Sequence, residues 1–249
     1  MGLLNKFFGK KEDQLPPFDL SSLKIDMHSH LIPGIDDGSR SMDETIAMLS
    51  KFESLGIQKV ITTPHIMSDY FRNTPEIILG GLAKVKDAMR EVNLDIEIEA
   101  AAEYYFDETL MEKLRRKEKL LTFGDNHVLF EFSFHVKPPQ IEKLFFELLT
   151  QNYKPVLAHF ERYGFLFNQP EIARKWREQG ILIQMNYNSL FGHYGPVVKK
   201  QAEWLVENQQ IDFVSSDCHR MDHLMILEEN LSNRYLHKLA NLNLLNKTL

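Results

Sequence analysis

Histidines and aspartates gather in the stretch KIDMHSHLIPGIDDG, directly after a short apolar run. His28 and His30 are two residues apart, so on an extended backbone their imidazoles point to the same side. Asp36 and Asp37 follow in a turn that can return a carboxylate to the same place. Imidazole and carboxylate groups on one side of a chain are the ligands that divalent metal ions bind. The stretch therefore predicts a metal site.

Similar side chains follow other β-rich runs. Six of seven such runs lead into histidine, aspartate or glutamate, and Asp217 and His219 repeat the spacing of the first pair. A single such residue at a strand end is usually only solvated, so the argument depends on their coincidence. The set has no thiolate and is large enough for two or three ions of Mn, Fe, Zn or Mg. The candidate ligands are His28, His30, Asp37, His65, Glu103, Glu131, His159, Asp217 and His219.

The elements that must position these residues alternate along the chain. Stretches with helical spacing separate the β-rich runs, and four of them carry proline near the start, as helices do. Alternation of this kind implies parallel strands, and an open doubly wound α/β sheet and a closed barrel both fit. In either topology the loops at the carboxyl ends of the strands converge on one face. The expected strands are 23–27, 57–63, 94–100, 127–132, 154–158, 181–186 and 211–216, and the expected helices are 42–56, 74–92, 139–152, 170–180 and 196–210.

The domain organisation expected is an N-terminal arm over residues 1–22, with LPPF as a breaker, and one barrel domain over residues 23–249. The last stretch, 225–249, predicts a helix packed on the outside. No run of about 18 apolar residues is present, so we expect at most a peripheral membrane contact, through the arm.

Composition limits the partners and the compartment. The 249 residues are 43% hydrophobic, enough for a full core, and the formal net charge is −6, which does not favour a nucleic acid partner. The single cysteine, Cys218, cannot form an internal disulfide and suits a reducing compartment, so a cytoplasmic location is expected. Because Cys218 lies between two candidate ligands that face the site, it should point away as a packed thiol. The oligomeric state stays open.

The remaining histidines have weaker signals. His193, in the stretch NSLFGHYG after the sixth β-rich run, lies on the expected face and is a candidate for contact with substrate. The others have no partner at a matching spacing and are interpreted as surface or core residues. These are His127, His135, His223 and His237.

Five motifs in order give the sequence a family resemblance. DMHSH, TTPH, AAE, HFER and SSDCH resemble the polymerase and histidinol phosphatase (PHP) superfamily. Within it, HSHLIPGIDDGSRSMDETIAML, TPHI, AHFERY and SSDCH resemble the bacterial PHP-type protein-tyrosine phosphatases of capsule and exopolysaccharide operons. The similarity extends from about residue 24 to residue 220. It implies a distorted (β/α)7 TIM-like barrel with three divalent metal ions, manganese first among the candidates.

The resemblance also implies roles for individual residues. The first ion would be bound by His28, His30, Glu103 and Asp217, the second by Glu103 as a bridge with Glu131 and His159, and the third by Asp37, His65 and His219. Asp37 is preferred to Asp36 as the ligand from the turn. Arg162, three residues after His159, corresponds to an arginine that contacts phosphate.

The implied reaction is hydrolysis of phosphotyrosine by hydroxide that the ions activate. The implied substrate is the phosphotyrosine-bearing tail of a bacterial tyrosine kinase. Arg162, Asp217 and His219 are the expected catalytic residues, and either His219 or a water could supply a proton to the leaving group. Two alternatives stay open. One is an enzyme that acts with the same metal centre on histidinol phosphate, another small phosphomonoester or a nucleic acid end, although the acidic charge weighs against DNA. The other is a non-catalytic protein that binds phosphorylated tails.

Overall fold

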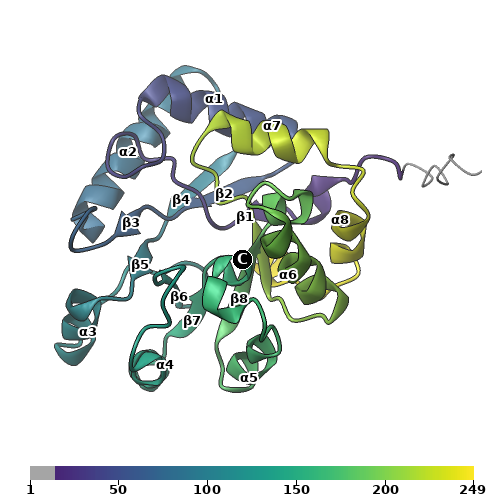
Figure 1. Cartoon of the computed structure of the whole chain (residues 1–249). Coiled ribbons are helices and arrows are strands. Elements are labelled where there is room, and N and C mark those ends of the chain that lie inside the picture. The colour runs from purple at the N-terminus through teal and green to yellow at the C-terminus, as the bar shows by residue number, and fades with distance from the viewer. Residues whose placement is uncertain (1–14) are drawn as a thin grey trace, which may run out of the picture.

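Parallel strands form the centre of the molecule. The computed structural model describes residues 15–249, in which nine short strands form two sheets with the orders β1-β2-β4 and β3-β5-β6-β7-β8-β9 (Figure 1). All the ladders are parallel. The strands are β1 Ile25–Asp26, β2 Lys59–Thr62, β3 His65–Ile66, β4 Glu97–Ala100, β5 Glu103–Tyr105, β6 His127–Glu131, β7 Lys154–Leu157, β8 Leu182–Asn186 and β9 Phe213–Ser215.

The two sheets are parts of one wall. β2 continues into β3 across Thr63 and Pro64, and β4 continues into β5 across two alanines. Backbone hydrogen bonds cross both breaks: the Thr63 N–H donates to the Ser29 carbonyl at 2.6 Å, and the Glu103 N–H to the Pro64 carbonyl at 3.1 Å. β2 with β3 and β4 with β5 therefore each form one interrupted strand of the barrel. Counted in this way, the barrel has seven strands, called staves below, which is the number expected from the sequence.

The wall closes between its last and first staves. Ser29 pairs in parallel with Cys218, and the Asp217 N–H donates to the His28 carbonyl at 2.9 Å. The His30 N–H donates to the Cys218 carbonyl at 2.8 Å. Of the two topologies that fit the sequence, the chain adopts the closed barrel.

Helices cover the outside of the barrel (Figure 1). All five expected helices are present, with ends within a few residues of those expected. One helix, α3, was not expected, and the expected C-terminal helix is two helices because Asn230 ends α7 and Asn233 caps α8. The helices are α1 Met42–Ser54, α2 Pro75–Glu91, α3 Glu108–Arg115, α4 Ile141–Thr150, α5 Ile172–Glu178, α6 Pro196–Glu207, α7 Met221–Glu229 and α8 Arg234–Leu239.

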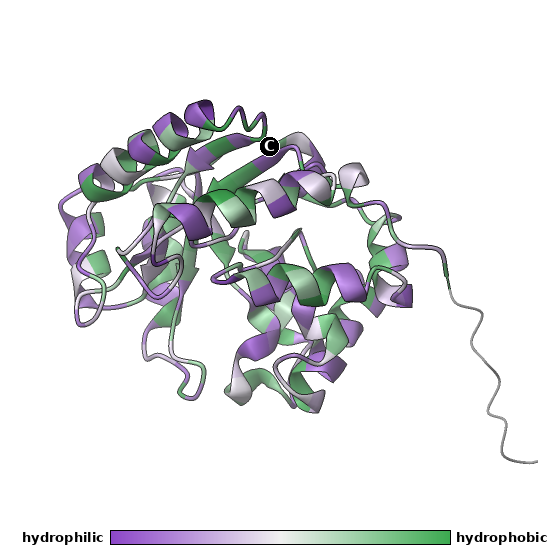
Figure 2. Cartoon of the chain, turned by 90° about the horizontal axis from the view of Figure 1, so that it is seen from above, coloured by the Kyte–Doolittle hydropathy of each residue, from purple (hydrophilic) through white to green (hydrophobic). Residues whose placement is uncertain are grey.

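Alternate residues of the strands enter two apolar clusters, as the two-residue period of a strand dictates. Ile61, Leu129, Val156 and Phe213 belong to a small cluster of strand and loop residues that fills the barrel. Their neighbours along the strands join a larger cluster with the buried faces of the helices. Coloured by hydropathy, the outer helices carry both hydrophilic and hydrophobic residues, as helices with one face on a core should (Figure 2).

The first 14 residues of the predicted N-terminal arm lie outside the described residues. The rest of it, residues 15–22, packs on the barrel: Phe18 is buried, and its N–H donates to the Leu231 carbonyl at 2.9 Å. Among the described residues, no helix combines the length and the apolar character needed to cross a membrane.

Side chains reinforce the closure of the barrel at the end opposite the candidate ligands. Asn246 is fully buried, and its Oδ1 accepts from the Val214 N–H at 3.0 Å. Its Nδ2 donates to the carbonyls of Ile25 at 2.9 Å and Val214 at 2.8 Å. One amide therefore joins β9 to β1 below the short ladder between them.

Replacing Asn246 should weaken this closure. We expect Asn246→Ala to lower the free energy of unfolding by about 3 kcal/mol, because it leaves buried backbone groups without partners. Denaturant titration of the metal-free protein measures the loss. Asn208→Ala, which removes one exposed bond to Trp204, is the control and should change the value by less than about 0.5 kcal/mol. Equal effects of the two substitutions would contradict the role assigned to Asn246.

Candidate metal centre

The nine side chains selected from the sequence come together at the carboxyl end of the barrel. Their donor atoms fall into four overlapping groups, and within each group the atoms lie no more than 4.8 Å apart. Most of the nine are buried. The groups are His30, Asp37, His65 and His219; His28, His30 and Glu103; His28, His159 and Asp217; and His65, Glu103 and Glu131.

Glu103, at the start of β5, lies at the centre of the cluster. Its Oε1 is 3.1 Å from Nε2 of His159. Its Oε2 is 3.2 Å from Nε2 of His28, 3.2 Å from Nδ1 of His65 and 3.4 Å from Nε2 of His30. Burial raises the pKa of this carboxyl, but the surrounding imidazoles lower it more, so the pKa lies well below its usual range. An ionised carboxylate that reaches four imidazoles is suited to bridge metal ions.

The partners of the ring nitrogens of His28 and His30 show whether these side chains suit a cation. Nδ1 of His28 lies 3.2 Å from Oε1 of Gln184, and Nδ1 of His30 lies 2.8 Å from Oδ2 of Asp36. Both partners are acceptors, so each Nδ1 can donate to its partner and each Nε2 is left to face the cluster. The two Nε2 atoms are 3.3 Å apart, and they lie 3.2 and 3.4 Å from Oε2 of Glu103. Two imidazole nitrogens and a carboxylate oxygen this close together form a donor set that suits a metal ion.

The two carboxylates of the turn Asp36-Asp37-Gly38 have different partners. Asp36 accepts from His30 Nδ1 and from the backbone N–H groups of Gly38 at 3.1 Å and His65 at 3.2 Å, so it orients a ligand. Oδ1 of Asp37 lies 3.5 Å from Nε2 of His65 and 3.4 Å from Nε2 of His219. Gly38 permits this turn because a Cβ there would lie 2.2 Å from the His30 carbonyl oxygen.

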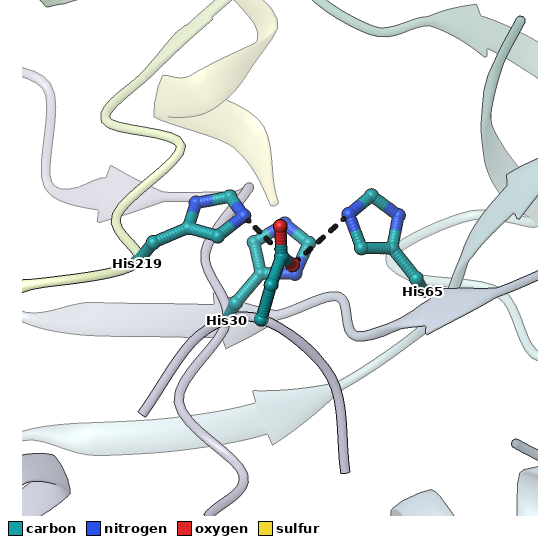
Figure 3. Close-up of side chains that lie close together, drawn as sticks. His30, His65 and His219 are labelled. Carbon is teal, nitrogen blue, oxygen red and sulfur yellow. Dashed lines mark ion pairs between the residues drawn. The ribbon is translucent and has the colours of Figure 1, made fainter. Parts of the chain in front are cut away.

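Figure 3 shows the imidazoles of His30, His65 and His219 gathered close together. His65 and His219 both form ion pairs with the same oxygen, Oδ1 of Asp37. The three histidines come from different staves of the barrel: His30 follows β1, His65 begins β3 and His219 follows β9. This arrangement matches the set expected for the third ion, with His30 as an additional neighbour.

A left-handed backbone directs two further candidate ligands to the cluster. His159 has φ 34° and Asp217 has φ 51°, backbone angles that residues other than glycine rarely adopt. Oδ1 of Asp217 lies 3.3 Å from Nε2 of His28. Its Oδ2 accepts from Nδ2 of Asn186 at 2.8 Å and from Nη1 of Arg162 at 3.1 Å. Asp217 thus touches both the histidines and the arginine expected to contact phosphate.

His65 connects the cluster to Glu131. Its buried Nδ1 lies 3.2 Å from Oε2 of Glu103 and 3.2 Å from Oε1 of Glu131 without making a hydrogen bond to either. Burial lowers the pKa of His65, but Glu103 and Glu131 overcome it and raise the pKa to about 9.

The charge of the cluster also suits cations. Five carboxylates lie within or beside it: Asp36, Asp37, Glu103, Glu131 and Asp217. The donor set is nitrogen and oxygen only. Cys218 is buried and points away, with Sγ 3.7 Å from Sδ of Met48, as predicted. The residues therefore fit divalent ions such as Mn²⁺, Fe²⁺, Zn²⁺ or Mg²⁺.

A cavity of about 490 Å³ opens onto the cluster. Arg162 and His193 line it, which places both predicted substrate-binding residues at the expected face. Aromatic side chains form much of the remaining wall: Phe71, Tyr105, Phe132, Phe134 and Tyr194.

Sequence reasoning missed part of this wall. His135 and His223, interpreted as surface or core, both line the cavity, and Nδ1 of His223 lies 3.1 Å from the Asp217 carbonyl oxygen. The position of His223, four residues after His219 at the start of a helix, was the available signal. His127 stacks on Phe123, and His237 contacts the Pro16 carbonyl at 2.9 Å, so these two lie elsewhere.

The fold and the cluster together define a β/α-barrel protein with a group of histidines and carboxylates suited to metal binding at the carboxyl end of its strands. The chain belongs to the CpsB/CapC family of capsular polysaccharide synthesis, whose model matches residues 24–233. This confirms the resemblance to the capsule-type proteins that the motifs indicated.

Relatives and solved structures agree with this assignment. The tyrosine-protein phosphatase CpsB of Streptococcus pneumoniae is 32% identical over 203 residues, which cover 80% of this chain and 84% of the relative. YwqE of Bacillus subtilis, also named a tyrosine-protein phosphatase, is 28% identical over 79% of this chain and 78% of its own.

The crystal structures of YwqE and CpsB, described as metal-dependent tyrosine phosphatases, include a chain that matches with a TM-score of 0.75 at 27% identity, covering 89% of this chain and 94% of that one. An amidohydrolase from Mycoplasma synoviae matches with a TM-score of 0.55 at 10% identity over 94% of this chain and 91% of its own, and supports the fold alone.

Metal binding should compete with protons. His65 has a pKa of about 9 in the metal-free protein, so at neutral pH it must lose a proton before Nδ1 or Nε2 can bind an ion. The affinity for Mn²⁺ should therefore fall as the pH drops below about 9 and should be weaker at about pH 6 than at about pH 8. Calorimetry in buffers of different ionisation enthalpy counts the protons released. An affinity independent of pH over this range would remove His65 from the ligands.

Proposed function

We propose that this chain is a metal-dependent protein-tyrosine phosphatase that hydrolyses phosphotyrosine. The observation that carries the proposal is the convergence of nine metal-type ligands and Arg162 on one aromatic-walled cavity. The family membership and the relatives named tyrosine phosphatases support the same reaction.

The ligand sets that we propose are those implied by the resemblance. His28, His30, Glu103 and Asp217 would bind the first ion, Glu103 with Glu131 and His159 the second, and Asp37, His65 and His219 the third. Three ions, with manganese as the native metal, are part of this proposal. When bound, such ions supply positive charge to phosphate oxygens and lower the pKa of a bound water.

Arg162 and Asp217 would position the phosphate. Arg162 donates to Oδ2 of Asp217 through Nη1, and its remaining N–H groups can bind phosphate oxygens. Asp217 also lies 3.3 Å from His28, so one carboxylate fixes the arginine relative to the metal ligands. Negative charge that develops on the phosphate in the transition state would thus meet a pre-positioned cation.

The aromatic wall favours an aryl ester. Phe71 stacks on His65 with ring centroids 5.4 Å apart and an angle of 12° between the planes, and it lines the cavity with Tyr105. A phenyl ring can pack against such side chains. A phenolate, with a conjugate acid of pKa about 10, also needs less help from a proton donor than an alkoxide does. His219 is a candidate for that proton, and His193 for a contact with the peptide.

The substrate that we propose is the phosphotyrosine-bearing tail of a bacterial tyrosine kinase of capsule synthesis. It rests on the family and on the names of its members. A cytoplasmic location would suit such a partner and agrees with the single cysteine.

Phosphate release from a phosphotyrosine peptide tests the proposed activity. We expect release by the metal-loaded protein, loss with a chelator and recovery when Mn²⁺ is added back. Histidinol phosphate is assayed in parallel. Turnover of histidinol phosphate without turnover of the peptide would favour the small-molecule alternative, and binding of the peptide without any hydrolysis would favour a non-catalytic role.

The ligand set has its own test. His28→Ala and Asp217→Ala should each lower kcat by at least about 100-fold and reduce the number of bound metal ions, because each removes a buried ligand. Elemental analysis and peptide turnover measure the two effects. The matched control is His237→Ala, a histidine outside the centre, which should keep both. Near-normal turnover of either first variant at saturating Mn²⁺ would exclude that residue from the site.

Arg162 should act on phosphate without holding metal. We expect Arg162→Ala to lower kcat/KM by about 100- to 1000-fold, the usual effect of removing one preorganised donor to the transition state. Its metal content should equal that of the wild type. An unchanged kcat/KM, or a loss of metal that accounts for the whole effect, would refute the role.

A further inference from the structure

Two aromatic rings enclose the guanidinium group of Arg162. Its Cζ lies 4.4 Å from the ring centroid of Phe134 and 4.3 Å from that of Tyr194. Phe134 lies in the segment after β6, Tyr194 in the segment after β8, and Arg162 in the segment after β7. Three neighbouring staves of the barrel thus contribute to one contact at the wall of the cavity.

The enclosure limits how Arg162 can bind. A guanidinium is planar and directs its five N–H groups outward within that plane. The rings lie within cation–π distance, and Nη1 is held by Asp217 at 3.1 Å. The remaining N–H groups are those available to an anion in the cavity, which Arg162 lines. The side chain is therefore fixed before a ligand arrives.

Both rings are held by their own surroundings. The Phe134 carbonyl accepts from the Gly164 N–H at 2.7 Å, and the Phe134 ring packs 5.2 Å from that of His159. Tyr194 lies within a tight turn in which the Gly195 N–H donates to the Gly192 carbonyl at 3.0 Å. Gly192 has φ 85°, a left-handed conformation that glycine adopts without strain.

The Tyr194 hydroxyl does not explain the position of the ring. It is buried and lies near Asn186 without a well-formed hydrogen bond among the described residues. What the ring contacts is Arg162 on one side and His193, at a centroid distance of 4.7 Å, on another. The face of the ring, rather than its hydroxyl, is the part engaged with the arginine.

We propose that Phe134 and Tyr194 are positioning residues that fix the plane of Arg162 for the phosphate group of the substrate. This inference rests on the proposed phosphatase function and adds to it the side chains that make Arg162 effective. Neither ring has to touch the phosphate. Because the rings already restrict the side chain, Arg162 loses little conformational entropy when it binds phosphate. More of its interaction energy is therefore available to stabilise the transition state.

A double-mutant cycle separates this role from a direct one. Tyr194→Leu and Phe134→Leu are each made in the wild type and in the Arg162→Ala variant, and kcat and KM are measured with a phosphotyrosine peptide. We expect each to lower kcat/KM by about tenfold in the wild type, the scale of one partly buried cation–π contact, and to add no loss when Arg162 is absent. Tyr194→Phe, which keeps the ring, should stay within about twofold of the wild type.

The control is Phe71→Leu. Phe71 lines the same cavity, and the described residues include no cation–π contact between it and Arg162. Any loss it causes should be the same with and without Arg162. Metal content and circular dichroism, expected to be unchanged in every variant, show that the fold and the centre are intact.

Two results would overturn the inference. Equal losses from Tyr194→Leu and Phe134→Leu in both backgrounds would mean that the rings act independently of Arg162. A loss from Tyr194→Phe as large as that from Tyr194→Leu would assign the role to the hydroxyl.

The inference can fail separately from the proposed function. Inorganic phosphate, titrated into the metal-loaded protein by calorimetry, should bind about tenfold more weakly to Tyr194→Leu than to the wild type, whether or not the peptide is hydrolysed. If the peptide is not hydrolysed but this difference in phosphate affinity is found, the phosphatase function is refuted and the role of the two rings is kept. If the peptide is hydrolysed but the two proteins bind phosphate equally well, the phosphatase function is kept and the role of the rings is refuted.

Discussion

The rest of the centre depends on the buried carboxylate of Glu103. An ionised carboxylate without water is costly unless opposite charges or strong donors surround it. Four imidazoles approach its two oxygens, and they come from segments that follow or begin three different staves. In turn, Gln184 and Asp36 fix the protonated nitrogens of His28 and His30. The position of one carboxylate therefore constrains the orientation of candidate ligands from three separate parts of the barrel.

Closure of the barrel and formation of the centre use the same backbone. The hydrogen bonds that join the last stave to the first involve His28, His30, Asp217 and Cys218, three of them proposed ligands. The left-handed conformation of Asp217 directs its side chain to His28 across that seam. Ions bound by His28, His30 and Asp217 would therefore also hold the ends of the sheet together, as ligands from distant segments do when binding is coupled to folding.

The candidate ligands have local signals in the sequence, whereas the barrel closure that brings them together has none. A two-residue spacing such as His28 to His30 and the position of Glu103 after a β-rich run are local signals. Closure depends on contacts between residues almost 200 positions apart, such as Ser29 with Cys218, and no local pattern encodes them. The different partners of Asp36 and Asp37 likewise appear only in the folded turn, where Asp36 accepts from His30 Nδ1 and Asp37 faces His65 and His219.

Helix α3 was missed because it has eight residues and too little length to establish a period. The same limit applies to the aromatic enclosure of Arg162. Phe134 and Tyr194 lie in irregular segments, 28 and 32 positions from Arg162, so neither spacing nor periodicity connects them to it. Arg162 itself was identified through the motif that it shares with His159.

The electrostatics of the centre explain why the arginine needs such support. The cluster holds five carboxylates, and a phosphate dianion that enters it adds more negative charge. Bound ions would offset most of this charge, but a flexible cation nearby would pair with whichever carboxylate it reached first. Asp217 takes one edge of Arg162, and the rings of Phe134 and Tyr194 restrict its plane. A lysine, with its mobile and strongly hydrated ammonium group, could not be restricted in this way. The two rings thus keep the guanidinium of Arg162 directed at the cavity. Without them, the other carboxylates of the cluster would compete for it.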